Sequence, residues 1–202
     1  MSTERVFASP AFVVDRIVVG TIDNNVFVIT DSATGDALLI DAADEPANIL
    51  SMVDGVAVTA VFTTHGHWDH HQAIPTVTDE LGVPFMIHVL DAAIAGKDVD
   101  VEIEAGTLKI GETTATVALT PGHTPGSVCL ILDGVVFTGD TLFPGGPGAT
   151  RFEHSSFATI IQSIEAELFT LPDTTVVLPG HGESTTIGTE RPQLAEWIER
   201  GW

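Results

Sequence analysis

The stretch GVAVTAVFTTHGHWDHH, residues 55–71, runs from an apolar segment directly into a histidine-rich turn. Four of the chain's eight histidines and one aspartate fall within residues 65–71. A buried imidazole needs a hydrogen-bond partner, and four of them in one turn would need more partners than a short segment offers. Imidazole nitrogens and carboxylate oxygens are ligands of zinc and iron, and a turn after a strand can aim alternate side chains at one point. The stretch therefore predicts a strand that ends in a metal-binding turn.

Apolar periodicity and glycine or proline breaks divide the rest of the chain into short elements. Strands are predicted over residues 11–20, 24–31, 36–44, 55–64, 84–89, 107–111, 114–120, 127–133, 134–140 and 175–178. Helices are predicted over residues 45–52, 72–81, 155–169 and 192–199. The strands form two clusters, each accompanied by helices, which favours an α/β fold with a four-layer αββα sandwich. The length of 202 residues suggests one domain, residues 1–202.

The composition argues against several classes of partner. The chain carries 28 acidic and 7 basic side chains, a net charge of -21, so most of its surface would repel nucleic acid. No basic segment followed by an apolar stretch opens the chain, and no run of about 18 apolar residues occurs, so neither secretion nor a membrane span is expected. The single cysteine, Cys129, lies in an apolar run and fits a reducing compartment. We therefore expect a cytoplasmic protein. Its oligomeric state is open, with Trp197 and Trp202 as candidates for an interface.

Three more polar residues stand where apolar strands run into glycine turns. His123 lies in TPGHTPGS, Asp140 in TGDTLF and His181 in LPGHGES. A lone loop histidine is usually solvated, but all three follow an apolar strand directly, and loops at strand ends are where rigid scaffolds place chemistry. They are candidates to complete the site that residues 65–71 begin.

The motif HxHxDH, followed in order by a histidine, an aspartate and a histidine, resembles the metallo-β-lactamase superfamily, from the LLIDAAD strand to PGHG. The resemblance implies a sandwich of two mixed β-sheets flanked by helices. It also implies two divalent metal ions, zinc in preference to iron or manganese. One ion would be held by His65, His67 and His123, the other by Asp69, His70 and His181, with Asp140 bridging both. Shared anions are what two adjacent cations need. Asp41 resembles the family's buried aspartate that supports the ligand turn.

Within the superfamily, GDTLFPGG and PGHGESTTIGTERPQLAEW resemble the glyoxalase II-like hydrolases, which cleave thioesters such as hydroxyacyl-glutathione. A hydroxide bridging the two metals would attack the acyl carbon of a small-molecule substrate, so Asp69 and Asp140 would be catalytic as well as ligands. The zinc β-lactamases with this histidine pattern carry cysteine where Asp140 stands, which disfavours antibiotic cleavage. The chain has no tyrosine and only two lysines, unlike the glutathione-binding region of glyoxalase II, so the thiol carrier stays open.

Three alternatives remain. A persulfide dioxygenase of the same fold would use one iron held by His65, His123 and Asp140, a two-histidine, one-carboxylate set. A lactone or ester hydrolase would use the same ligands as a thioesterase. A non-catalytic metal-binding protein is disfavoured by the complete ligand set.

Several residues near the motifs are not expected to bind metal. We interpret His71, His88 and His154 as solvated or locally bonded, and Arg151 as a surface residue rather than a substrate anchor. Trp68 is expected to pack against the turn. The run FPGGPGAT, residues 143–150, lacks the ending of a phosphate-binding loop and is interpreted as a flexible rim beside Asp140.

Overall fold

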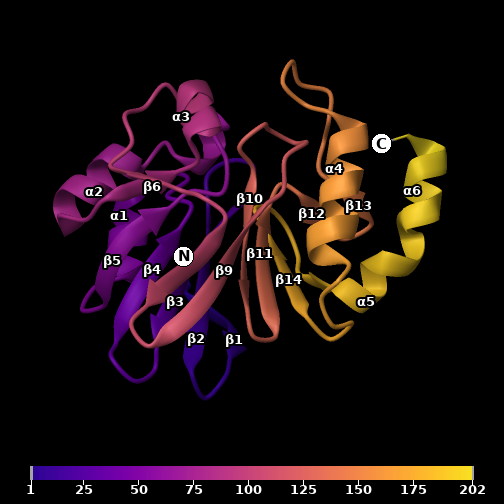
Figure 1. Cartoon of the computed structure of the whole chain (residues 1–202). Helices are drawn as coiled ribbons and strands as arrows, with labels where there is room; N and C mark the ends of the chain where they lie inside the picture. Colours follow the sequence, from indigo (N-terminus) through magenta and orange to yellow (C-terminus); the bar gives the residue numbers. More distant parts are fainter. Residues whose placement is uncertain (1, 202) are drawn as a thin grey trace.

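The computed structural model describes residues 2–201, and its two β-sheets pack face to face with helices on both outer sides (Figure 1). The predicted α/β class and αββα layer order are confirmed. Both sheets are mixed, as the resemblance implies.

The first sheet holds seven strands in chain order. Strands β1 to β4 pair antiparallel, and strands β4 to β7 pair in parallel. The parallel strands are connected by helices, which carry the chain back to the start of the next strand. The strands are β1 (Glu4–Ala8), β2 (Phe12–Val19), β3 (Asn24–Asp31), β4 (Asp36–Ile40), β5 (Ala57–Phe62), β6 (Phe85–Ile87) and β7 (Val101–Glu102).

The second sheet has the order β15-β14-β11-β10-β9-β8. Among its described strands, only β11 and β14 pair in parallel, since the chain between them crosses through helices. The strands are β8 (Gly106–Ile110), β9 (Thr113–Leu119), β10 (Val128–Leu132), β11 (Val135–Gly139), β14 (Val176–Pro179) and β15 (Thr185–Thr186). A separate hairpin joins β12 (Leu142–Phe143) to β13 (Gly146–Pro147), so part of the glycine run predicted as a flexible rim is paired.

Helices cover the outer face of each sheet (Figure 1). The first sheet carries α1 (Pro46–Met52), α2 (Ile74–Leu81), α3 (Val89–Ala95) and the 3-10 turn η1 (Trp68–His70). The second carries α4 (Phe157–Ser163), the π-helical segment η2 (Ile164–Leu168), α5 (Ile187–Glu190), the 3-10 turn η3 (Arg191–Gln193) and α6 (Leu194–Arg200). Among the described residues, no helix is long and apolar enough to cross a membrane.

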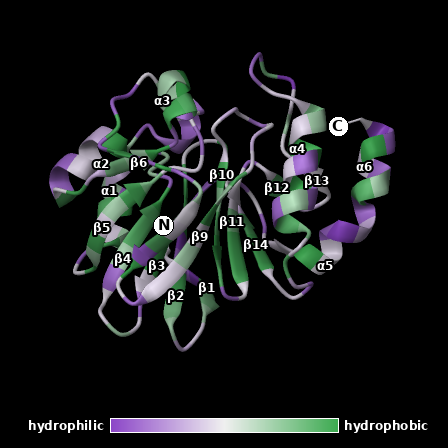
Figure 2. Cartoon of the chain, in the orientation of Figure 1, coloured by the Kyte–Doolittle hydropathy of each residue, from purple (hydrophilic) through white to green (hydrophobic). Residues whose placement is uncertain are grey.

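Three apolar clusters match the three contacts between the four layers. The central cluster lies between the sheets and includes Phe27, Phe62 and Phe137. One outer cluster packs the first sheet against α1 and α2, and the other packs the second sheet against α4 and α6. Figure 2 shows the strands mostly hydrophobic and the helices of mixed hydropathy, as this layering requires.

The sequence-based assignments differ from the structure mainly in short elements. The strand predicted over residues 84–89 ends at Ile87, and Val89 already belongs to α3, which was not predicted. The helix predicted over residues 155–169 is split into α4 and the π-helical segment, with Ser156 as the N-cap. Trp197 is fully buried in the outer cluster of the second sheet, so the proposal that it lies on an interface is wrong. Trp202 lies outside the described residues.

The two sheets are joined by hydrogen bonds at one edge of the sandwich. The Asn25 N–H donates to the Gly180 carbonyl at 2.8 Å, and the Val128 N–H donates to the Thr64 carbonyl at 3.0 Å. Asn25 lies in β3 and Thr64 follows β5 in the first sheet, whereas Gly180 follows β14 and Val128 begins β10 in the second. The histidine-rich turn and the loops after β9, β11 and β14 meet along this edge.

Candidate metal centre

All seven predicted ligands lie together at the edge where the two sheets meet. The residues His65, His67, Asp69 and His70 follow β5 in the first sheet. His123, Asp140 and His181 follow β9, β11 and β14 in the second. Their ligand atoms form three overlapping groups, each with all atoms within 4.8 Å of one another: His65, His67 and His123; His65, His70 and Asp140; and Asp69, His70 and His181. The structure thus brings the residues together, and their role as metal ligands stays a prediction.

The first ligand group, His65, His67 and His123, places three ring nitrogens around one point. His67 Nδ1 is 3.2 Å from His65 Nε2 and 2.9 Å from His123 Nε2. His123 Nδ1 donates to the Ala149 carbonyl at 2.8 Å, which leaves the lone pair of Nε2 facing the group. A single N–H on His67 Nδ1 cannot donate to the Nε2 atoms of both His65 and His123 at once. A metal cation, in contrast, can accept a lone pair from each of the three nitrogens. The geometry therefore fits a metal ion.

Burial keeps this first ligand group neutral. Burial, with the neighbouring His123, lowers the pKa of His67 to about 4. Burial also lowers the pKa of His65 well below its usual value, and the surrounding histidines add to the shift. Metal ligation requires neutral imidazole. Near neutral pH these rings are in the form that a metal ion binds.

The second ligand group is Asp69, His70 and His181. His181 Nε2 lies 3.1 Å from Asp69 Oδ2, and His70 Nε2 lies 3.5 Å from the same oxygen. His70 Nε2 is buried without a hydrogen-bond partner. A buried nitrogen without a hydrogen-bond partner costs folding free energy unless another group, such as a cation, lies between it and the carboxylate. This donor set, two imidazoles and a carboxylate, also fits a divalent metal ion.

Asp140 lies between the two groups with one oxygen directed to each. Its Oδ2 is 3.5 Å from His123 Nε2, and its Oδ1 is 3.5 Å from His70 Nε2 and 3.8 Å from His181 Nε2. Oδ1 is buried and has no hydrogen-bond partner. Burial opposes ionisation of the carboxyl, but the charge of His70 and its interaction with the carboxylate outweigh burial and lower the pKa of Asp140. An ionised carboxylate in this position fits the predicted bridging role.

Asp41 supports the second group, as the resemblance implies. It is buried and has a left-handed backbone conformation, with φ of 56°. Its carboxylate accepts bonds from the Thr64 N–H at 2.8 Å, from the Thr64 hydroxyl at 2.9 Å and from His70 Nδ1 at 2.9 Å. The last bond holds the His70 proton on Nδ1 and leaves Nε2 facing Asp69 and Asp140.

The sequence reasoning missed two asparagines that connect the sheets at the site. The Asn24 side-chain N–H₂ donates to Asp69 Oδ2 at 3.1 Å and to the Asp69 carbonyl at 3.0 Å. Asn25 donates to the carbonyls of Pro179 and Gly182, both at 2.9 Å, and so holds the loop that carries His181. The available signal was the polar pair NN at the start of an otherwise apolar strand.

The other histidines do not join the centre. His71 Nε2 donates to the Gly66 carbonyl at 3.2 Å, and His88 caps α3 by accepting from the Leu90 N–H at 3.3 Å. His154 is exposed. The expectation that these residues are solvated or locally bonded agrees with the structure.

One aromatic side chain, Phe152, borders the first ligand group. The Phe152 ring meets the His67 ring edge to face at 4.7 Å and is 41% exposed. Trp68 is 60% exposed, so the prediction that it packs against the turn is wrong. The 3-10 turn buries its neighbours Asp69 and His70, and Trp68 faces solvent. Arg151 is exposed and lies over the Phe152 ring at 5.5 Å.

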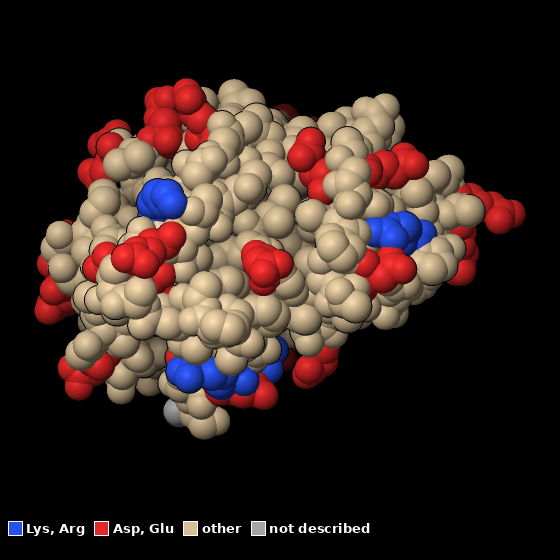
Figure 3. Space-filling model, turned by 60° about the horizontal axis from the view of Figure 1, so that its bottom comes forward, with Lys and Arg blue, Asp and Glu red and all other residues tan. Residues whose placement is uncertain are grey.

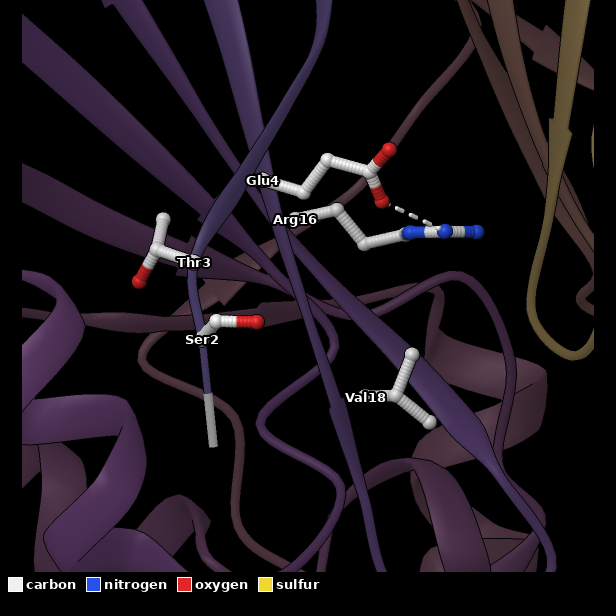
Figure 4. Close-up of a pocket in the computed structure, with 5 residues that line it drawn as sticks. All are labelled: Ser2, Thr3, Glu4, Arg16 and Val18. Carbon is white, nitrogen blue, oxygen red and sulfur yellow. Dashed lines mark hydrogen bonds and ion pairs between the residues drawn. The ribbon is translucent and has the colours of Figure 1, made fainter.

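A surface groove of about 610 Å³ lies along β1 and β2, and none of the seven converging residues lines it (Figure 4). It is lined by Ser2, Thr3, Glu4, Arg16 and Val18. Arg16 pairs with Glu4 at 2.9 Å, so its charge is already neutralised. The groove supplies no ligand to the metal centre.

The sequence pattern of the metallo-beta-lactamase superfamily matches residues 19–181, which include all seven converging residues. The chain belongs to this superfamily. Among curated members, it is 34% identical to a probable metallo-hydrolase of Bacillus subtilis, over 88% of this chain and 94% of that protein. It is 30% identical to a hydroxyacylglutathione hydrolase of Haemophilus influenzae, over 77% and 84% of the two chains. Among solved structures, ETHE1 from Myxococcus xanthus superposes with a TM-score of 0.81 at 31% identity, over 90% of this chain and 84% of that one.

Membership of the superfamily confirms the predicted family and fold. The histidine and aspartate groups agree with the divalent metals that the superfamily implies.

Proposed function

We propose that the chain is a metal-dependent hydrolase that cleaves a thioester of a small acyl group. Asp140 carries the proposal, because its two oxygens face different ligand groups. Two divalent metal ions held there, most simply zinc, would lower the pKa of water so that hydroxide exists near neutral pH, and would polarise the substrate carbonyl. In the overall reaction, water adds across the acyl carbon–sulfur bond and gives an acid and a free thiol.

The chain's own residues prepare the site for this chemistry. Asp41 fixes the proton of His70 on Nδ1, and Asn24 holds the Asp69 carboxylate. Asp140 contributes a charge that both ligand groups share. Phe152 presents apolar surface beside the first ligand group, where an acyl chain can lie, and Trp68, the residue after His67, exposes a second aromatic side chain on the same turn.

The likeness to the Haemophilus influenzae hydroxyacylglutathione hydrolase supports a thioester as the substrate. The proposal leaves the thiol carrier unnamed, because the chain has no tyrosine and only 7 lysines and arginines. The net charge of -21 disfavours nucleic acid as a partner. Figure 3 shows one face with acidic side chains scattered over it and few basic ones. A cytoplasmic location is part of the same proposal.

The test starts with protein purified without added metal. Its zinc, iron and manganese are counted, and hydrolysis is measured with a panel of thioesters, lactones and a chromogenic β-lactam. We expect two divalent ions per chain and thioesters as the best substrates. Asp140→Ala should abolish turnover, while Asp133→Ala, an exposed aspartate in the turn between β10 and β11, should not change it. Unchanged hydrolysis in Asp140→Ala would overturn the proposal.

An iron-dependent dioxygenase is the second candidate, since His65, His123 and Asp140 also form a two-histidine, one-carboxylate set. The His65 and His123 ring centres lie 4.8 Å apart, and His123 reaches Asp140 at 3.5 Å. One iron per chain, with oxygen uptake on glutathione persulfide, would favour this candidate. Preferential turnover of a lactone would instead indicate an ester hydrolase.

A further inference from the structure

A buried carboxylate outside the predicted ligands lies beside the first ligand group. Asp91, in the first turn of α3, has no exposed surface. A buried carboxylate is costly unless its oxygens accept several hydrogen bonds. The hydrogen-bond donors to Asp91 therefore show which parts of the chain stabilise its buried charge.

All three donors to Asp91 come from the two loops that carry the first ligand group. Oδ2 accepts from the Gly66 N–H at 2.7 Å and from the Thr124 hydroxyl at 2.5 Å. Oδ1 accepts from the Gly126 N–H at 2.6 Å. Gly66 lies between His65 and His67, and Thr124 follows His123. One carboxylate thus connects the backbone segments on either side of the predicted metal.

The packing around Asp91 leaves no room for these loops to shift toward it. A Cβ at Gly66 would lie 2.3 Å from the Asp91 carbonyl oxygen, and one at Gly126 would lie 2.6 Å from Asp91 Oδ1. The two loops approach the helix this closely because both positions are glycine. Short hydrogen bonds and close packing act together here, so the spacing of the two loops depends on Asp91.

We propose that Asp91 is a positioning residue that sets the distance between the loops bearing His67 and His123, and so sets the metal affinity of the first ligand group. This inference rests on the metal centre of the proposed function but not on its substrate. Supporting groups of this kind change metal affinity by about 10- to 100-fold when they are altered. In Asp91→Asn, an amide N–H₂ replaces one oxygen and must face at least one of the three donors. The loops should then separate at the first ligand group.

Asp31 provides a matched control. It is also buried, and its carboxylate accepts from the Thr34 N–H at 2.8 Å and from the Thr113 N–H and hydroxyl at 2.8 and 2.6 Å. It too connects two turns from different sheets. However, it ends β3, whereas Asn24 at the metal centre begins that strand. Asp31 is seven positions along the strand from Asn24, about 23 Å.

The experiment titrates apo-protein with zinc against a chromogenic chelator and resolves the two metal equivalents. Unfolding of each apo-protein in urea is measured in parallel. In Asp91→Asn we expect one equivalent to bind about 10- to 100-fold more weakly and the other to stay at the wild-type affinity. In Asp31→Asn we expect lower stability but wild-type affinity for both equivalents.

Several outcomes would overturn the inference. Wild-type affinity for both equivalents in Asp91→Asn would do so, and so would an equal loss of affinity in Asp91→Asn and Asp31→Asn. If Asp91→Asn does not fold, Thr124→Val decides, because it removes a single donor to the carboxylate. It should weaken the same equivalent by about fivefold, and unchanged affinity would contradict the positioning role. If the wild-type protein itself binds fewer than two ions, the dinuclear centre of the proposed function fails instead.

Discussion

Replacing Asp41 by asparagine tests how strongly the second ligand group depends on its supporting carboxylate. Asparagine tolerates the left-handed conformation at this position, φ of 56°, so the backbone should stay in place. The amide has one oxygen, while the carboxylate faces two fixed N–H donors on different sides, Thr64 N at 2.8 Å and His70 Nδ1 at 2.9 Å. Whichever way the amide turns, one N–H meets an N–H₂ group.

The magnitude follows from that lost bond. A hydrogen bond to a buried charged group contributes about 1.5–3 kcal/mol, so the unfolding free energy of the apo-protein should fall by about that amount. If the His70 proton moves to Nε2, the nitrogen that faces Asp69 and Asp140 can no longer accept a metal ion. The metal equivalent held by Asp69, His70 and His181 should then bind about 10- to 100-fold more weakly.

Urea unfolding of the apo-protein and chelator competition for zinc measure the two effects separately. Asp41→Asn and Asp91→Asn should each weaken a different metal equivalent, because Asp41 contacts the second ligand group and Asp91 contacts the loops of the first. Wild-type affinity for both equivalents together with unchanged stability in Asp41→Asn would refute the reasoning.

Three further predictions concern residues around the centre and at the far end of the sandwich. His71→Ala should keep both metal equivalents and lose about 1–3 kcal/mol of stability, as metal analysis and urea unfolding will show, because its ring bonds only to the backbone. Trp68→Ala and Phe152→Ala should each raise KM for an apolar acyl thioester about 10-fold in steady-state assays. Val101→Ala, an exposed position on the edge strand β7, should leave KM unchanged. Equal KM values in all three variants would contradict an apolar substrate-binding surface formed by Trp68 and Phe152. Hydrogen bonds from Thr113 and Thr34 lower the pKa of Asp31. The ionised carboxylate therefore contributes fully to stability above about pH 4, and this contribution is lost at lower pH. In urea unfolding, the stability of Asp31→Asn should fall less than that of the wild type between about pH 6 and about pH 3.

Long apolar strands and the ligand motifs were predictable because each depends on local sequence. The seven converging residues follow β5, β9, β11 and β14, all with clear apolar patterns. Short elements were harder. The helix α3 has only seven residues, and its N-cap is His88 rather than one of the usual serine, threonine or aspartate residues. The strand β1 is an exposed edge, which weakens its alternating pattern.

The supporting residues could not be predicted, because their roles depend on contacts distant in sequence. Asn24 bonds to a residue 45 positions away, and Asp91 to one 33 positions away. The pair Asn24-Asn25 stands out as polar at the start of an apolar strand, but it does not show which residue it contacts, and nothing in the local sequence distinguishes Asp91 from an ordinary polar residue. The same limit explains Trp68, since the direction of a side chain in a 3-10 turn depends on which neighbours the tertiary structure buries.

The division of the ligands between the two sheets has a consequence for folding. Neither the chain up to β7 nor the chain from β8 onward carries a complete ligand set, so metal can bind fully only after the two sheets have docked. An ion that binds only the docked state stabilises it in proportion to the logarithm of its free concentration. With metal bound, the centre would act as a cross-link between the halves of the sandwich, and metal removal should then increase the rate at which they open to proteases.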